Sequence, residues 1–432
     1  MFYFQKEYQN IVLLSTFILV FELCTCTGLG PTSDEPQSSW PTPFKAIWNV
    51  PTYNCFHHFG VDLGLAKFDI LANKEEQKTG DEIVIFYKPQ LGLYPYYDPT
   101  TLRPVNGGLP QLVDLYQHLE KATQDVIAAV PNKDFSGIGI IDWEYWRPQW
   151  EMNWDSREIY KNKSLEVVRA RNPHWGSERV ELVARLEFEQ AAKSLMDSTL
   201  RLVKELRPMG HWGFYHFPYC DNVKSPNGTC NPVSVLSNNN ITWLFDSSTA
   251  LYPSIYFNGF QKDKRDNAMF KLMETFRVRN MSRHQDLPIY VYTRFNYSHS
   301  SLYYPKTDLK NSILLAAELG CDGVVFWGDH NDSRSLQSCQ ELQSYVNSTL
   351  GPFVKGVTEA ATLCSQRVCS GRGRCVGNIM ACSDNFKNQG GWSNAYIGPQ
   401  HSGQKELNNL SMSCRCSCYK GWQGTACNKK NK

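Results

Sequence analysis

Short apolar runs and longer amphipathic stretches alternate along most of the chain. Seven short runs rich in β-branched and aromatic residues have the pattern of buried strands. They are Phe44–Val50, Glu82–Tyr87, Gly137–Glu144, Gly210–Phe217, Ala250–Phe257, Leu287–Phe295 and Cys321–Gly328. Between most of them, apolar residues recur at helical spacing, in the segments Leu109–Val130, Ser177–Leu206, Arg265–Val278 and Thr307–Leu319. Strands that alternate with helices predict parallel β/α units.

The carboxyl ends of the predicted strands carry aromatic and charged side chains. They are Tyr87, Asp142, Glu144, Tyr215, Tyr252, Tyr256, Tyr292, Arg294 and Trp327. In a closed β/α barrel the carboxyl ends of the strands build the site. About seven strands that end in this way favour an α/β fold of TIM-like barrel type over an open sheet. The pattern therefore predicts a groove lined by aromatic rings around two acids, which suits a sugar polymer.

The run Gly137–Pro148 carries the strongest chemical signal. Its apolar half ends in Asp142 and Glu144, which lie two positions apart and so project from the same face of a strand. Two adjacent carboxylates disfavour double ionisation, so one of them should hold a proton near neutral pH. A proton held in this way is what a general acid needs. The alternative is a surface turn whose acids are simply solvated.

Composition narrows the class of protein. Aromatic residues make up 13% of the chain, and the formal net charge is only +2. A near-neutral chain argues against a general nucleic-acid-binding protein. His57-His58 lacks a spaced acidic partner, and no His-Glu-x-x-His, Gly-x-Ser-x-Gly or phosphate-loop motif occurs. We therefore predict no metal, no cofactor and no nucleic-acid partner.

The N-terminal stretch has the pattern of an export signal. Lys6 precedes the apolar run Ile11–Phe21, which is too short to span a bilayer, and small residues follow it. We expect a signal peptide over 1–28 and a loose segment over 29–43, and a signal anchor is the alternative. No later segment suggests a membrane anchor. Eight Asn-x-Ser/Thr sequons indicate a secreted, extracellular glycoprotein, and they begin at Asn162, Asn227, Asn240, Asn280, Asn296, Asn331, Asn347 and Asn409.

The C-terminal part of the chain has a different composition. Of 15 cysteines, two lie in the export signal, which leaves 13 and therefore at least one unpaired. The spacings Cys364-x4-Cys369-x5-Cys375 and Cys416-x-Cys418-x8-Cys427 are typical of an epidermal-growth-factor-like module. Zinc is the rival use of dense cysteines, but an exported chain favours disulfides. We expect a barrel over 44–355 and a disulfide-rich module with an insert over 360–432.

Several segments, in this order, resemble the hyaluronidase family of animal glycosidases. They are Ile85–Tyr87, Leu91–Pro95, Asn106–Gln111, Asp134–Gly137, Ile141–Pro148, Trp212–Tyr215, Leu251–Tyr256 and Gly323–Trp327. The resemblance runs from about Pro43 to Lys429, and it is specific because the segments occur together. It implies a distorted (β/α) barrel with a growth-factor-like module and an endo-β-N-acetylhexosaminidase activity on hyaluronan, with chondroitin sulfate as a second candidate substrate. We expect a monomer.

The resemblance implies that Glu144 is the general acid. Asp142 would remain ionised and hold the substrate's acetamido group, whose carbonyl oxygen would be the nucleophile. The residues themselves favour the same scheme. Side chains at i and i+2 of one strand lie on one face, so Asp142 and Glu144 cannot stand on opposite sides of a sugar, as two-carboxylate glycosidases require.

Six further residues match family positions along the substrate path. They are Tyr87, Arg147, Tyr215, Tyr256, Lys271 and Trp327. By resemblance, Tyr215 and Tyr256 would orient the acetamide, and Trp327 would form a wall for the sugar. Lys271 stands where some members use an arginine to meet a substrate carboxylate, and a lysine offers a point charge in place of a planar fork.

The family pattern also implies a disulfide framework. The expected pairs are Cys55–Cys339, Cys220–Cys230, Cys364–Cys375, Cys369–Cys416 and Cys418–Cys427. Cys382 and Cys414 then remain as a pair within the insert. Cys321, which heads an apolar strand, is left over and should be a buried thiol.

Two other functions remain open from the sequence. A chitinase-like hydrolase also uses a strand-borne acid pair, although the usual longer run of spaced aspartates before the acid is missing here. A non-catalytic glycan-binding or adhesion protein would keep the groove but could lose Glu144, which is present. Activity on hyaluronan, chondroitin and chitin would separate the three functions.

Overall fold

The computed structural model describes residues 43–222, 225, 227–298, 300–387 and 414–431. The predicted export signal, nearly all of the predicted loose segment and Asn409 lie outside the described residues. No helix in the described part of the chain is long and apolar enough to cross a membrane.

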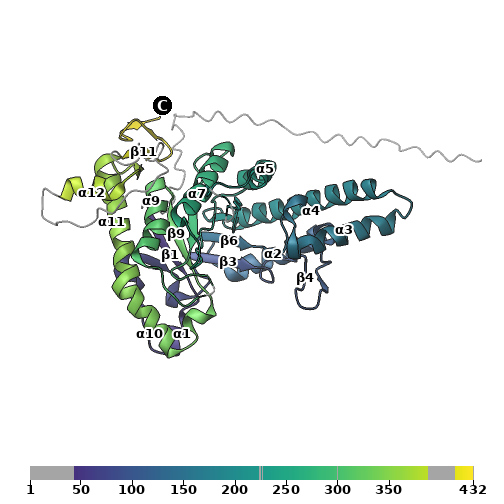
Figure 1. The fold of residues 1–432 in the computed structure, drawn as a ribbon, viewed down its shortest axis with the longest axis horizontal. Coiled ribbons are helices and arrows are strands. Elements are labelled where there is room, and N and C mark those ends of the chain that lie inside the picture. Colours follow the sequence, from purple (N-terminus) through teal and green to yellow (C-terminus); the bar gives the residue numbers. More distant parts are fainter. Residues whose placement is uncertain (1–42, 223–224, 226, 299, 388–413, 432) are drawn as a thin grey trace, which may run out of the picture. The chain divides into compact units, whose positions relative to one another are not determined.

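Parallel strands form the barrel that the alternating pattern predicted (Figure 1). The strands are β1 (Lys45–Asn49), β2 (Ile70–Ala72), β3 (Ile83–Tyr87), β6 (Ile138–Asp142), β7 (His211–Phe214), β8 (Tyr290–Thr293) and β9 (Gly323–Trp327). Ladders join β2 to β1, β1 to β9 and β9 to β8, and also β3 to β6 and β6 to β7. Their spatial order around the barrel is the order of the chain.

The segment predicted as a strand over Ala250–Phe257 pairs only through isolated bridges. Tyr252 bridges to Tyr215 after β7, while Leu251 and Ser254 bridge to Ile289 and Tyr292 of the next unit. This segment therefore completes the path from β7 to β8 without a regular ladder. Strand β2 was not predicted, because its three residues are too few to show a period.

The barrel has a seam between β2 and β3, where the described strands form no ladder. The buried side chain of Asn73, which follows β2, spans this seam. Its amide nitrogen donates to the carbonyls of Ile83 and Gln77 at 2.9 and 2.8 Å, and its oxygen accepts from the amides of Glu82 and Ile83 at 3.1 Å. One side chain thus supplies the main-chain hydrogen bonds that a ladder would supply.

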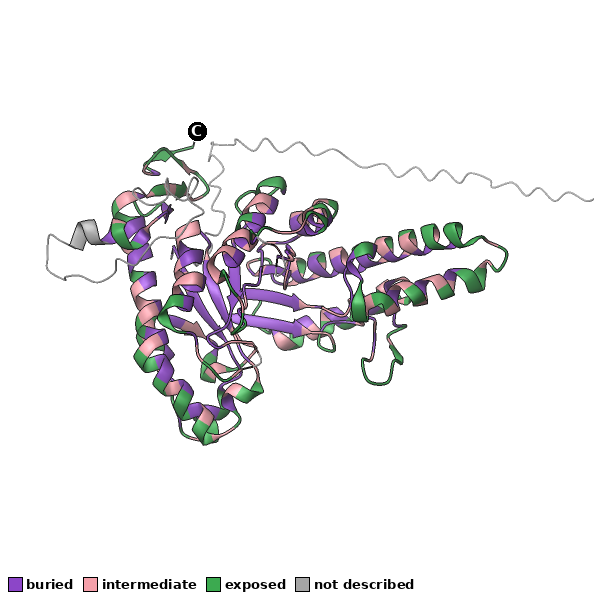
Figure 2. Cartoon of the chain, in the orientation of Figure 1, coloured by how far each residue is buried: buried purple, intermediate pink, exposed green. Residues whose placement is uncertain are grey.

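Apolar side chains from the strands fill the barrel interior, and the strands are the most uniformly buried elements in Figure 2. The inner cluster contains Ile47, Ile83, Ile85, Ile138, Ile140, Ala250, Tyr252, Tyr290, Tyr292 and Val325. Tyr87, Tyr215, Tyr256 and Trp327 pack against it, and they come from the carboxyl ends of the strands. This filled interior closes the barrel below the predicted groove.

Helices surround the strands. They are α1 (Tyr53–His57), α2 (Leu115–Ala129), α3 (Glu158–Arg171), α4 (Ser177–Leu206), α5 (Pro232–Asn240), α6 (Thr242–Ser247), α7 (Lys264–Met281), α8 (Lys306–Leu309), α9 (Leu315–Leu319), α10 (Leu336–Tyr345) and α11 (Gly351–Val368). The predicted helix Ser177–Leu206 has the observed bounds, because its apolar stripe is long and unbroken. Helix α2 begins later than predicted, since Pro110 opens a separate 3-10 turn and Asp114 caps the helix by accepting from Gln117.

The C-terminal module begins within α11 (Gly351–Val368), which continues through residues 355–360 without a break. It contains β10 (Gly373–Val376) paired with β11 (Arg415–Cys418), α12 (Ile379–Lys387), and β12 (Trp422–Gln423) paired with β13 (Lys429–Lys430). Arg374 of β10 forms an ion pair with Asp322, which directly precedes β9. The module therefore contacts the barrel at the amino ends of the strands.

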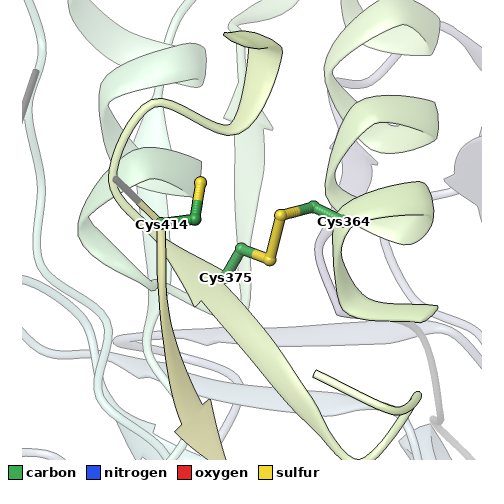
Figure 3. A group of neighbouring side chains, drawn as sticks. All are labelled: Cys364, Cys375 and Cys414. Atoms are coloured by element: carbon green, nitrogen blue, oxygen red, sulfur yellow. A yellow bond between two sulfur atoms is a disulfide. The ribbon is translucent and has the colours of Figure 1, made fainter. Parts of the chain in front are cut away.

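Six disulfides are present in the described residues, and their pairing is the predicted one. They are Cys55–Cys339, Cys220–Cys230, Cys364–Cys375, Cys369–Cys416, Cys382–Cys414 and Cys418–Cys427. Cys321 is buried and free, as expected. Cys414 lies beside the Cys364–Cys375 bridge, with the three sulfur atoms within 4.8 Å of one another (Figure 3). Because all three sulfurs belong to disulfides, they are not thiolate ligands for a metal.

Candidate active site

Asp142 and Glu144 stand at the carboxyl end of β6, where the ladder with β3 places Asp142 opposite Tyr87. Burial, together with the neighbouring charge of Glu144, raises the pKa of Asp142 to about 8, and Arg147 opposes this shift. The side chain of Glu144 is more open, with 43% of its surface exposed. The pair can therefore keep one proton at neutral pH, with Asp142 as the buried member and Glu144 as the accessible one.

The peptide that joins Glu144 to Tyr145 is held from both sides. Arg157 donates from Nε and Nη2 to the Glu144 carbonyl at 3.1 and 3.0 Å. The amide of Tyr145 donates to Tyr94 Oη at 3.1 Å. The Tyr94 ring lies between Trp143 and Trp146, at centroid distances of 4.6 and 5.3 Å. The main chain that carries the accessible acid is thus fixed by two separate segments.

Aromatic side chains surround the acid pair. Trp327 Nε1 donates to Tyr87 Oη at 3.1 Å, and the Trp327 ring stacks on Tyr256 at 6.0 Å. Tyr215 lies 6.5 Å from the Tyr256 ring, and its hydroxyl donates to Ser254 Oγ at 3.3 Å. Burial raises the pKa of Tyr87 to about 12 and that of Tyr215 further, so both hydroxyls stay protonated and can donate hydrogen bonds.

Arg147 is buried beside the pair, with only 5% of its surface exposed. Its Nη2 lies 3.5 Å from Glu144 Oε1, and its guanidinium packs near the rings of Phe217 and Tyr219. Nη1 is buried and has no hydrogen-bond partner among the described residues. The structure therefore places a positive charge directly behind Glu144.

Lys271 reaches the site from α7. Its ammonium lies 3.5 Å from the carbonyl of Ser254, the residue whose hydroxyl accepts from Tyr215. Burial lowers the pKa of Lys271, and the charge of Asp221 opposes this shift. The structure thus brings all eight predicted site residues to the same end of the barrel, with Lys271 behind Tyr215 and Ser254.

Arg294 and its partners form a second charged group at this end of the barrel. The Arg294 guanidinium lies 4.9 Å from the Trp327 ring centroid and pairs with Asp329 and Asp332 at 3.6 and 3.9 Å. Asn296 accepts from Arg294 Nε and donates to Asp332. Trp327 is therefore contacted by Arg294 as well as by Tyr87 and Tyr256.

Asn296 corrects the list of predicted glycosylation sites. Only 3% of its surface is exposed, and its amide is hydrogen-bonded at both ends, so it has no room for a glycan. Six other sequon asparagines are exposed, and they are Asn162, Asn227, Asn240, Asn280, Asn331 and Asn347. The sequence motif does not report burial, which is why it included Asn296.

Several site residues were not singled out from the sequence. Ser254, Tyr94 and Arg157 contact the segment of the acid pair or its aromatic neighbours, and Asp329 pairs with Arg294. Ser254 and Tyr94 lie inside segments that resemble the hyaluronidase family, so that resemblance could have indicated them. Arg157 lies in the turn before α3, where the sequence has no strand or helix periodicity that would indicate which side chains face the barrel.

The chain matches a known protein family. Residues 34–431 match the family model described as Hyaluronidase. The chain is 40% identical over 412 residues to Hyaluronidase-1 of Rattus norvegicus, with 90% of each chain covered. It is 36% identical over 438 residues to Hyaluronidase-4 of Homo sapiens, with 97% of this chain and 90% of that one covered.

A solved structure shows the same fold. The bee venom hyaluronidase in complex with a hyaluronic acid tetramer is 33% identical and superposes with a TM-score of 0.68. The match covers 72% of this chain and 98% of the bee protein. The chain belongs to the hyaluronidase family and is a glycosidase.

Proposed function

We propose that the protein hydrolyses the β-1,4 bonds of hyaluronan as an endo-β-N-acetylhexosaminidase. The observation that carries this proposal is the acid pair at the end of β6, with one buried and one accessible carboxyl between aromatic walls. The bee venom relative, whose solved structure contains a hyaluronic acid tetramer, supports the choice of polymer. Chondroitin sulfate, which shares the alternation of N-acetylhexosamine and uronic acid, is the second candidate substrate.

The acid pair would exchange its proton when substrate binds. In the free protein the raised pKa of Asp142 puts the proton on this buried carboxyl, whereas the sequence led us to expect it ionised throughout. A substrate acetamide N–H that donates to Asp142 would favour its ionised form. The proton would then be available to Glu144, whose side chain is 43% exposed and would protonate the departing glycosidic oxygen.

The substrate would supply its own nucleophile. The acetamide oxygen attacks the anomeric carbon as the bond to the leaving oxygen breaks, and the ionised Asp142 stabilises the positive charge that develops on the acetamide nitrogen. Glu144 then acts as the base that takes a proton from the incoming water. Two inversions at one carbon give net retention of the β configuration.

The surrounding residues would position the reacting sugar. Tyr215 and Tyr256 orient the acetamide, Trp327 forms the wall against the ring, and Tyr87 holds Trp327 through its hydroxyl. Arg147 stabilises the Glu144 carboxylate after proton transfer. Lys271 would act indirectly, by holding the main-chain carbonyl of Ser254.

Three measurements test the proposed function. A reducing-end assay should show cleavage of hyaluronan and not of chitin, and proton NMR should show the β anomer as the first product. Hyaluronan from which the acetyl groups have been removed should not be cut, because it lacks the nucleophile. An α product, or undiminished cleavage of the de-N-acetylated polymer, would show that the substrate is not its own nucleophile.

We also propose that the chain is an exported, monomeric glycoprotein, with a barrel over 44–355 and a growth-factor-like module over 360–432. Six disulfides support export, because such bonds persist in oxidising compartments. The exposed sequon asparagines support glycosylation. Mass spectrometry of the secreted protein before and after enzymatic deglycosylation would test both points.

A further inference from the structure

Lys88 is held in a small aromatic cage beside the acid pair. It follows Tyr87, which is opposite Asp142 in the β3–β6 ladder. Its ammonium lies 4.1 Å from the ring centroid of Tyr145 and 4.5 Å from that of Tyr96, and it donates to Tyr145 Oη. The two rings are 4.9 Å apart and tilted by 42°. The cage therefore joins the end of β3, the residue after Glu144, and the short strand β4 (Tyr96–Tyr97).

The positive charge of Lys88 is positioned but not neutralised. Ring faces attract an ammonium without cancelling its charge. In the described part of the chain, no carboxylate forms an ion pair with Lys88, and Tyr145 takes only one of its three donors. The charge of Lys88 contributes to lowering the pKa of Asp98, but the Asp98 carboxylate accepts its hydrogen bonds from Thr100 and Thr101.

The other named cations around the acid pair each have a carboxylate or a main-chain carbonyl as a partner. Arg294 pairs with Asp329 and Asp332, and Arg147 pairs with Glu144. Arg157 donates to the Glu144 carbonyl, and Lys271 to that of Ser254. Lys78, whose ammonium lies 5.3 Å from the Tyr87 ring centroid, is near the charge of Asp329. Lys88 has neither a carboxylate nor a carbonyl oxygen as a hydrogen-bond partner in the described part of the chain, and its cage includes Tyr145, the residue after Glu144.

The chemistry of an alternating polymer gives this cation a ligand. If the acetamide of one sugar lies over Asp142, the neighbouring sugar is a uronic acid, which carries one carboxylate. We propose that the Lys88–Tyr96–Tyr145 cage is a subsite that binds the uronate carboxylate of the sugar next to the reacting N-acetylhexosamine. This inference rests on the proposed function, which gives the position of the polymer relative to Asp142. It adds a residue that recognises the negative charge of the polymer.

Binding to a hyaluronan octasaccharide and to its methyl ester tests the subsite, because esterification removes the carboxylate charge and keeps the sugar rings. Both dissociation constants would be measured by calorimetry in the Glu144→Gln protein, with and without Lys88→Met. A charged hydrogen bond lost in this way should weaken octasaccharide binding roughly tenfold to a hundredfold. The methyl ester should bind weakly to both proteins and equally to each.

Two controls make the result specific. Lys88→Arg should keep most of the affinity, because it keeps the charge. Lys133→Met should change nothing, because Lys133 is exposed in the turn before β6, at the opposite end of the barrel. Higher salt should narrow the difference between the two oligosaccharides in the Lys88 protein only.

Three other outcomes would overturn the inference. Equal weakening of octasaccharide and ester by Lys88→Met would mean that Lys88 only organises the two rings. No weakening of either would mean that Lys88 does not touch the polymer, and weakening confined to a chondroitin sulfate octasaccharide would assign the subsite to sulfate. If the wild-type protein cuts no polymer while Lys88 still distinguishes the two oligosaccharides, the proposed activity fails and the subsite stands.

Discussion

A largely buried aspartate has an oppositely charged partner at one end of the barrel and a second acid beside it at the other. At the amino ends of the strands, Asp322 accepts from the Ile289 amide at 2.9 Å and from Arg374 of the C-terminal module. At the carboxyl ends, Asp142 stands beside a second acid, and burial raises its pKa to about 8. The ion pair between Asp322 and Arg374 holds the module against the barrel. The two neighbouring acids Asp142 and Glu144 share a proton that can be transferred. The same residue type is thus used for cohesion at one end and for chemistry at the other.

Glu144→Gln should produce the largest effect at the reactive end. The amide keeps the shape of the side chain and removes the proton, so we expect hydrolysis to fall by roughly 10²–10⁴-fold. Thermal unfolding should stay near that of the wild type, because Glu144 is 43% exposed. Glu120→Gln, on the exposed face of α2, is the matched control and should retain activity. A folded Glu144→Gln protein with normal turnover would exclude Glu144 as the general acid.

Arg374→Met should produce the largest effect at the cohesive end. It leaves Asp322 without its charged partner, and breaking a largely buried pair costs about 3 kcal/mol in the free energy of unfolding. Urea denaturation measures this loss, while the specific activity of the folded protein should stay normal. The double variant Arg374→Met with Asp322→Asn should recover part of the stability, since no charge is left unpaired. An unchanged urea midpoint in Arg374→Met would mean that the pair does not hold the module.

Asp142→Asn should stabilise the folded protein by an amount that depends on pH. The usual pKa of an aspartate is 3.8, and that of Asp142 in the folded chain is about 8, so the folded state holds its proton over a range in which the unfolded state has lost it. Wild-type stability therefore falls as the pH rises from about 4 to about 8. Asparagine removes this dependence and should raise the melting temperature by roughly 5 °C at pH 8, and hardly at all at pH 4. Melting curves across this range decide the matter, and a constant difference between the two proteins would contradict it.

Arg157→Lys should have the smallest effect, because it loosens the support of Glu144 without touching its carboxyl. A lysine cannot give both hydrogen bonds to the Glu144 carbonyl, so we expect kcat to fall about tenfold at an unchanged KM. Tyr94→Phe removes the acceptor for the Tyr145 amide and keeps the ring stack, so it should give the same signature. Steady-state kinetics separate the two constants. A rise in KM alone would show that the clamped peptide does not position Glu144.

Much of the fold was predictable because its signals are local. The acid pair follows an apolar run, and the apolar stripe of Ser177–Leu206 gave the bounds of α4. Helix α3 was missed because its face toward α4 is short and its sequence largely polar. Strand β2 was missed, and the segment Ala250–Phe257 was predicted as a regular strand although it forms only isolated bridges. Both errors have a related reason. The pairing of both segments depends on neighbours that are distant in sequence, and a period of two cannot report it.

The parts of the site that escaped prediction are side chains that act on main chain. Arg157 and Tyr94 hold the peptide after Glu144, and Asn73 spans the seam beside β3. Such contacts need the folded geometry, since any polar residue in a loop could make them. Asn296 shows the converse, because a sequence motif for modification occurs at a position that the fold uses internally.

The bond between Cys55 and Cys339 has a mechanical consequence. It joins α1 to α10 across a sequence separation of 284, so every strand from β2 to β9 lies inside a covalent ring. A force applied at the two ends of the chain would pass from one sulfur to the other and would not load those strands. A protease that cuts a single loop within the ring would leave the two pieces joined. Under tension, the parts that extend first would be the flanking segments, which include β1, and the module, while the chain from β2 to β9 stays unextended until the bond is reduced.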